Sequence, residues 1–181
     1  MSLENLSLVP KHTIEYGQYL NPDSVLSFFR DRCITKYIYC IKYKGIVLKY
    51  GMSCPKSGRT YPGERVYRQL AHCYSWGEAR IRGSSGADWI YIEEDFKKLY
   101  GTDIDHKDIT VVVWDFSNFE FMSYRPALEI KKIESSLIEQ YTKLVGERPI
   151  GNLENEVYNK NRGFVATSHF ESLYQPQEYY K

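Results

Sequence analysis

Residues 36–52 read KYIYCIKYKGIVLKYGM, two runs rich in tyrosine, isoleucine and valine on either side of Lys44-Gly45. Aromatic and β-branched runs that flank a glycine-containing turn are typical of a β-hairpin. Strand alternation places four side chains of the first run on one face: Tyr37, Tyr39, Ile41 and Tyr43. Tyrosines on one strand face usually serve packing, so these residues first predict a folded core.

The turn decides which side chain of the second strand lies opposite Tyr39. A two-residue turn would place Tyr50 there, but it would require a left-handed conformation at Lys44. A three-residue turn over 43–45, with Gly45 left-handed, is sterically easier and places Lys49 opposite Tyr39. We expect the three-residue turn and keep Tyr50 as the alternative.

Around this hairpin the chain predicts a small α/β (α+β) domain. Helices are expected over 24–30, 64–74, 88–99 and 126–145, and a buried strand over 109–116. The hairpin and this third strand would form a small, mainly antiparallel sheet flanked by helices. We expect a single domain with an N-terminal lead-in (1–34), a core with inserted loops (35–152) and a C-terminal tail (153–181).

Composition narrows the classes of protein. The 181 residues are 43% hydrophobic and 26% charged, which fits one compact domain and excludes disordered, collagenous and coiled-coil chains. The formal net charge of +1 argues against a binder that uses its whole surface, so any nucleic-acid contact must come from a local patch. Short apolar runs and cysteines without CxxC spacing predict a cytoplasmic protein with no membrane contact.

Glu134 interrupts the apolar stripe of the expected helix 126–145. At 3.6 residues per turn, that stripe consists of Ile130, Ile133, Leu137, Ile138 and Tyr141. A carboxylate that faces a core must meet a cation or be protonated. On geometry alone, a buried ion pair with an arginine and a metal ligand are equally good interpretations.

A local basic patch is present between residues 56 and 82. Its basic residues, Lys56, Arg59, Arg65, Arg68, Arg80 and Arg82, outnumber the acidic Glu64 and Glu78. Within the expected helix 64–74, Arg65, Arg68, Gln69 and His72 share one side. A solvated helix face is the commoner explanation for such charges, but the excess of cations favours phosphate binding.

Five sequence features in this order resemble the GIY-YIG nuclease family: Tyr37-Ile38-Tyr39, Lys49-Tyr50-Gly51, Arg65 in a helix, Glu134-Ser-Ser-Leu-Ile in a later helix, and Asn152. The likeness runs over 36–152, and the order of the motifs carries it. Tyr37 replaces the family's first glycine. Lys49 replaces the first tyrosine of the second motif, as in a branch of GIY-YIG type II restriction endonucleases. Gln69 stands where many members carry His or Tyr, and His72 is the candidate to compensate.

The resemblance implies a metal-dependent endonuclease that hydrolyses duplex DNA at a defined sequence. Glu134 would bind Mg²⁺ (or Mn²⁺), and Arg65 would hold the scissile phosphate. Tyr39 would be the general base, assisted by the Lys49 cation. Asn152 would orient this assembly or contact DNA. Phosphates of the DNA would be bound by the patch residues Lys56, Arg59, Arg68, Arg80 and Arg82.

Each chain would have one catalytic centre, but duplex DNA has two strands to cut. We therefore expect a homodimer. Two alternatives remain, a phage or homing-type GIY-YIG nuclease and a DNA-binding module of the same fold without catalysis. Retention of Tyr39, Arg65 and Glu134 together favours an enzyme, since a pure binder needs no core-facing carboxylate.

Overall fold

The computed structural model describes residues 3–15, 23–55, 62–73, 87–121 and 124–152. The helices are α1 (Asp23–Asp31), α2 (Glu64–Cys73), α3 (Ala87–Tyr100) and α4 (Pro126–Val145). The strands are β1 (Lys11–Glu15), β2 (Tyr37–Tyr43), β3 (Ile46–Ser53) and β4 (Ile109–Asp115). Three short 3₁₀ helices complete the described elements: η1 (Leu3–Leu8), η4 (His106–Asp108) and η5 (Ile150–Asn152). The predicted helices and third strand are confirmed to within one or two residues.

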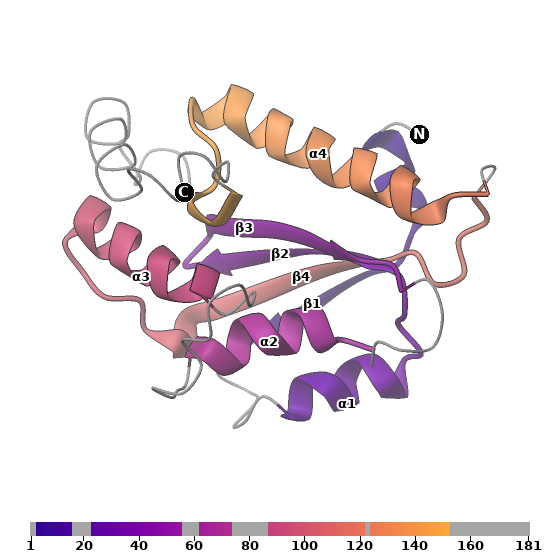
Figure 1. Ribbon diagram of the computed structural model, residues 1–181, viewed down its shortest axis with the longest axis horizontal. Coiled ribbons are helices and arrows are strands. Elements are labelled where there is room, and N and C mark those ends of the chain that lie inside the picture. Colours follow the sequence, from indigo (N-terminus) through magenta and orange to yellow (C-terminus); the bar gives the residue numbers. More distant parts are fainter. Residues whose placement is uncertain (1–2, 16–22, 56–61, 74–86, 122–123, 153–181) are drawn as a thin grey trace.

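The strands form one antiparallel sheet in the order β1-β4-β2-β3 (Figure 1). This arrangement confirms the predicted small sheet flanked by helices, with one correction. The segment that we expected to be only a lead-in supplies a fourth strand, β1, which pairs with β4. Only Ile14 of β1 is buried, so its sequence lacks the alternation of apolar residues by which a strand is recognised.

Each face of the sheet has its own core, and Figure 1 shows α4 on one face with α1 and α2 on the other. The first core joins the four side chains Tyr37, Tyr39, Ile41 and Tyr43 to residues of α1, α2 and α3. The packing interpretation of these tyrosines is therefore confirmed. The second core joins Ile38, Cys40 and Tyr50 to the apolar stripe of α4.

The hairpin turn differs from our expectation. Tyr43 pairs with Ile46, so Lys44 and Gly45 form a two-residue turn with φ angles of 47° and 88°. Both residues are left-handed, as in a type I′ turn. Lys44 gains two contacts with Asp108, a backbone hydrogen bond of 3.4 Å to its carbonyl and an ion pair of 3.2 Å to its carboxylate. These contacts with η4 help to hold a conformation that a lysine rarely adopts.

A β-bulge then shifts the register of β3. Ile41 pairs with Lys49 but Lys42 pairs with Val47, which leaves Leu48 as the extra residue. The residue opposite Tyr39 is consequently Gly51, and the prediction of Lys49 at that position is wrong by two residues, because Lys49 pairs with Ile41. Lys49 nevertheless lies on the Tyr39 face, diagonally across the pair of strands. Tyr50 packs in the core of the opposite face, so the alternative is wrong as well.

The C-terminal end of α4 follows the sequence closely. Gly146 is left-handed, with φ 95°, and its N–H donates to the carbonyl of Thr142 at 2.8 Å. The predicted stop is confirmed. Among the helices of the described ranges, none is both long enough and apolar enough to span a lipid bilayer.

Candidate active site

A cavity of about 610 Å³ opens at the edge strand β3, between α2, α4 and η5. Six of the seven candidate catalytic residues line it: Tyr39, Lys49, Arg65, Gln69, Glu134 and Asn152. Tyr39 and Glu134 come from opposite faces of the sheet, and the two faces meet only where the sheet ends. The edge position of β3 therefore brings together side chains that strand and helix periodicity assign to different cores.

Gly51 makes room for Tyr39. A Cβ atom at Gly51 would lie 2.3 Å from both Oη and Cζ of Tyr39, far inside van der Waals contact. The phenol thus lies directly over the Gly51 backbone, and its hydroxyl end reaches the β3 edge. A glycine is required here because the ring occupies the space of a side chain.

Gly151 has the corresponding relation to Lys49. A Cβ atom at Gly151 would lie 2.9 Å from the Lys49 Cβ and 2.8 Å from the Cδ1 of Ile92. Lys49 is only 9% exposed, and η5 packs against its aliphatic stem while the residue lines the cavity. Such packing limits the rotamers of a side chain that is otherwise flexible.

Glu134 is buried, and its Oε2 accepts a bond of 2.5 Å from the Nζ of Lys131. The ion-pair interpretation was right about a cation but wrong about its type, because we expected an arginine. The Lys131 side chain is 58% exposed, so its ammonium can return to water when another cation takes the carboxylate.

The donor set of the cavity suits a hard cation. No group of three or more His, Cys, Asp and Glu side chains within the described residues could cage a metal ion. Mg²⁺ is commonly held by one or two carboxylates and keeps several of its waters. Glu134, a single carboxylate buried at the wall of an open cavity, fits that mode of binding.

Helix α2 presents Arg65 and Gln69 to the cavity. It begins directly after Gly63, whose φ of 79° lets the chain turn closely against Phe29. Arg65 therefore lies in the first turn and is exposed, whereas Gln69, one turn later, is 1% exposed. Arg65 can reach a ligand in solvent, and Gln69 forms part of the cavity wall.

Asn152 binds the backbone of the edge strand. Its Oδ1 accepts from the Tyr50 N–H at 2.7 Å, and its Nδ2 donates to the Tyr50 carbonyl at 2.9 Å. The amide thus takes the place of a neighbouring strand at β3. Of the two roles expected for Asn152, this geometry favours orientation of the assembly over contact with DNA.

Tyr37 is buried beside the start of α2. Its hydroxyl lies near Ser53 and the N–H groups of Arg65 and Val66, but within the described residues none of these meets hydrogen-bond geometry. Burial raises the pKa of this phenol to about 12, with smaller opposing effects from those groups and from the Arg65 charge. The ring packs against those of Phe29 and Tyr39, with centroid distances of 4.7 Å and 6.3 Å.

We expect Tyr37→Phe to change the alkaline stability of the protein. Burial favours the neutral phenol, so its contribution is fully present below about pH 10 and is lost as the pH rises toward about 12. The loss in the wild type approaches roughly 3 kcal/mol above about pH 12 and reaches about half of that at pH 11, and it is absent in the variant. Urea unfolding from neutral pH to about pH 11 measures the difference. If the free energy of unfolding fell with pH equally steeply in both proteins, the burial of the Tyr37 phenol would be contradicted.

The remaining predicted site residues fall outside the described side chains. Lys56, Arg59, Arg80 and Arg82 lie outside the described residues. Arg68 and His72 belong to α2, but their side chains are not among those described.

Sequence reasoning missed Lys131 and Arg148, which also line the cavity. Lys131 precedes Glu134 by three positions, and that helical spacing would have identified it as the partner of the carboxylate. Arg148 carries no such local signal, because it follows the end of α4.

Comparisons of the chain with protein-family models, with curated proteins and with solved structures returned no match. The functional inference therefore depends on the geometry of the cavity and on the motifs of the sequence.

Proposed function

We propose that the protein is a metal-dependent endonuclease that hydrolyses phosphodiester bonds of duplex DNA, and that it acts as a site-specific type II restriction endonuclease. One observation carries the proposal. Six side chains that the motifs single out come from five separate elements, between Tyr39 of β2 and Asn152 of η5, yet line one cavity. Packing alone does not require a phenol, a lysine, an arginine and a buried carboxylate to converge at a sheet edge.

Phosphodiester hydrolysis needs a held phosphate and an activated water. Arg65, exposed at the cavity, would bind the scissile phosphate through charge-assisted hydrogen bonds that strengthen in the transition state. Tyr39 would accept a proton from the attacking water. The Lys49 ammonium, on the same sheet face, would stabilise negative charge on the Tyr39 oxygen.

Glu134 is the residue that would hold Mg²⁺ or Mn²⁺, whose charge neutralises the phosphate oxygens during hydrolysis. For that, Lys131 would leave Oε2, a move that its exposed side chain allows. Asn152 would keep β3, and with it Lys49 and Gly51, in place at the cavity.

Specificity and assembly are part of the proposal. One catalytic centre per chain cuts one strand at a time, so a double-strand cut is simplest for a symmetric homodimer on a palindromic target. The proposed setting is the cytoplasm, where such an enzyme meets duplex DNA.

Plasmid cleavage tests the proposal directly. We expect the wild type with Mg²⁺ to cut a plasmid of known sequence at discrete sites, which end mapping would locate. Glu134→Gln should lower the rate at least about a hundredfold, because a lost metal ligand removes several kcal/mol of transition-state stabilisation. The matched control is Glu139→Gln, which removes an exposed carboxylate of the same cavity and should cut normally.

Three outcomes would contradict parts of the proposal. No cleavage by the wild type with Mg²⁺ or Mn²⁺ would contradict the nuclease. Near-normal cleavage by Glu134→Gln would contradict the metal role and leave Glu134 as the partner of Lys131. Ends scattered over the plasmid would contradict site specificity.

A further inference from the structure

A second cavity, of about 1120 Å³, lies beside the candidate active site. It is lined by the residue before β2, the end of β3, the start of α2 and the first turns of α4. Three residues line both cavities: Met52, Arg65 and Lys131. The two cavities therefore form one continuous surface, with Arg65 at their boundary. We call the second cavity the basic groove.

All charged side chains described in the basic groove are positive. Lys36, Arg65, Arg125 and Lys131 line it, and none of the described residues that line it is acidic. Lys131 is partly neutralised by Glu134, which faces the neighbouring cavity. Of these four cations, only Arg65 belongs to the patch that the sequence indicated between residues 56 and 82.

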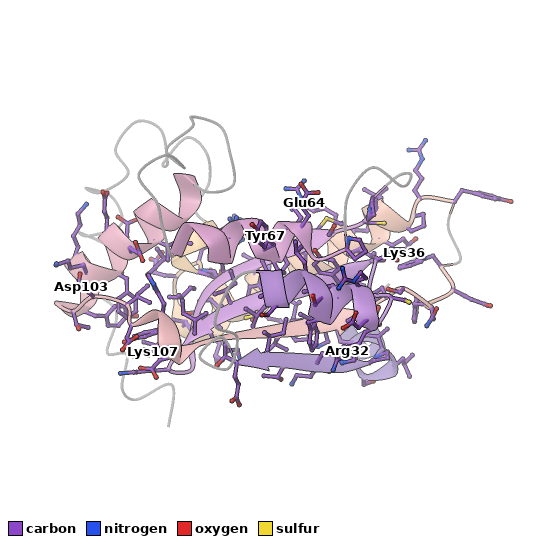
Figure 2. The ribbon with its side chains drawn as sticks, turned by 90° about the horizontal axis from the view of Figure 1, so that it is seen from below. Arg32, Lys36, Glu64, Tyr67, Asp103 and Lys107 are labelled. Carbon is purple, nitrogen blue, oxygen red and sulfur yellow. The ribbon has the colours of Figure 1, made fainter. Side chains whose placement is uncertain are left out.

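Lys36 is fixed at its backbone and extends its side chain to the basic groove. Its carbonyl accepts from the Phe116 N–H at 2.8 Å, and its ammonium lies 5.7 Å from the centre of the Phe121 ring. Figure 2 shows Lys36 at the end of the molecule opposite Asp103 and Lys107. The Lys36 charge also acts on the thiol of Cys54, whose pKa burial raises and this cation lowers.

Arg125 is fixed by the start of α4. Its carbonyl accepts from the N–H groups of Leu128 and Glu129, at 3.0 Å and 3.3 Å. Its neighbour Tyr124 is fully exposed and also lines the basic groove. Exposed aromatic rings beside cations are a recurring feature of surfaces that bind nucleic-acid strands.

Cations supplied by separate elements suit a ligand with repeated negative charges. A single phosphate is usually bound by donors that converge on one point, whereas a DNA strand presents a phosphate at every nucleotide. We propose that the basic groove binds the backbone of the DNA strand beside the scissile phosphate, with Lys36 and Arg125 on phosphates to one side of the bond that Arg65 holds. This inference rests on the proposed function and adds the path of the strand to it.

Alkylation of the wild-type protein tests the strand path without any substitution. Cys54 lines the basic groove, while the exposed Cys33 lines neither cavity. We expect saturating duplex DNA, in EDTA and at low salt, to slow the reaction of Cys54 with N-ethylmaleimide at least several-fold and to leave Cys33 unchanged. Peptide mass spectrometry reports both rates. An unchanged rate at Cys54 under saturation would overturn the proposal.

Salt dependence provides a second measurement. The double variant Lys36→Gln/Arg125→Gln should reduce the slope of log K against log salt by about 1.8, since each phosphate contact contributes about 0.9. The control Lys107→Gln/Lys143→Gln removes the same charge from exposed positions outside both cavities and should keep most of the slope. Equal slopes for the two double variants would overturn the groove as a DNA contact.

The outcomes separate this inference from the nuclease proposal. The wild type could cleave DNA while Cys54 stays unprotected and the two double variants show equal salt slopes. That result would overturn the role of the groove and leave the nuclease proposal intact. Protection of Cys54 with a reduced slope, but without cleavage, would support the groove and overturn the nuclease. Failure of the wild type to bind duplex DNA at low salt would overturn both.

Discussion

Arg65→Ala is expected to lower the single-turnover rate of DNA cleavage by about two orders of magnitude or more. Arg65 is an exposed cation at the boundary of the two cavities, on the first turn of a helix whose start is set by Gly63. A donor that strengthens its bonds as charge develops on the phosphate contributes roughly this much to catalysis. Rapid-quench cleavage with enzyme in excess measures the chemical step without product release.

Two companion variants distinguish catalysis from simple attraction. Arg65→Lys keeps the charge but loses the planar fork of donors, so we expect only partial recovery of the rate. Arg30→Ala removes an exposed arginine of α1 that lines neither cavity, and it should cut like the wild type. Weaker DNA affinity with an unchanged rate at saturation would reduce Arg65 to a binding contact.

Gly51→Ala is expected to be the second most damaging substitution. A methyl group at Gly51 would have to occupy the position of the Tyr39 hydroxyl end, so either the phenol or strand β3 must shift. A displacement of a reacting group by about 1 Å can cost on the order of a hundredfold in rate. We therefore expect a loss of cleavage of that order, which single-turnover kinetics would show, with a smaller change in urea stability.

Gly101→Ala is the matched control for this variant. Gly101 has a left-handed φ of 67°, but a Cβ atom there meets nothing within 4 Å. This variant should lose some stability through its backbone and keep its cleavage rate. The double variant Gly51→Ala/Tyr39→Phe should regain neither stability nor activity, because Cζ and Cε1 of the ring, 2.3 Å and 2.6 Å from the added Cβ position, remain in phenylalanine. Full activity of Gly51→Ala would contradict the placement of Tyr39.

The local sequence pattern was sufficient to predict most helices and strands of the fold. Helix α4 follows from Pro126, its apolar stripe and Gly146, and the two tyrosine-rich strands follow from their composition. The details of the hairpin did not follow. Its turn is held by Asp108, which lies far along the chain from Lys44, and its bulge buries Leu48 in one core and the neighbouring Val47 in the other. Propensity favoured the easier turn, and tertiary contacts stabilised the other.

The sequence by itself determined which residues are candidates for chemistry: Tyr39, Lys49, Arg65 and Glu134 stand out through motif order and through a charge within an apolar stripe. Only the tertiary structure decided how they meet. The bulge keeps Lys49 on the face of Tyr39, and the bonds of Asn152 to Tyr50 hold the edge strand. Side-chain periodicity is a property of a few neighbouring residues, whereas a cavity at a sheet edge depends on strand order and on helices packed against opposite faces.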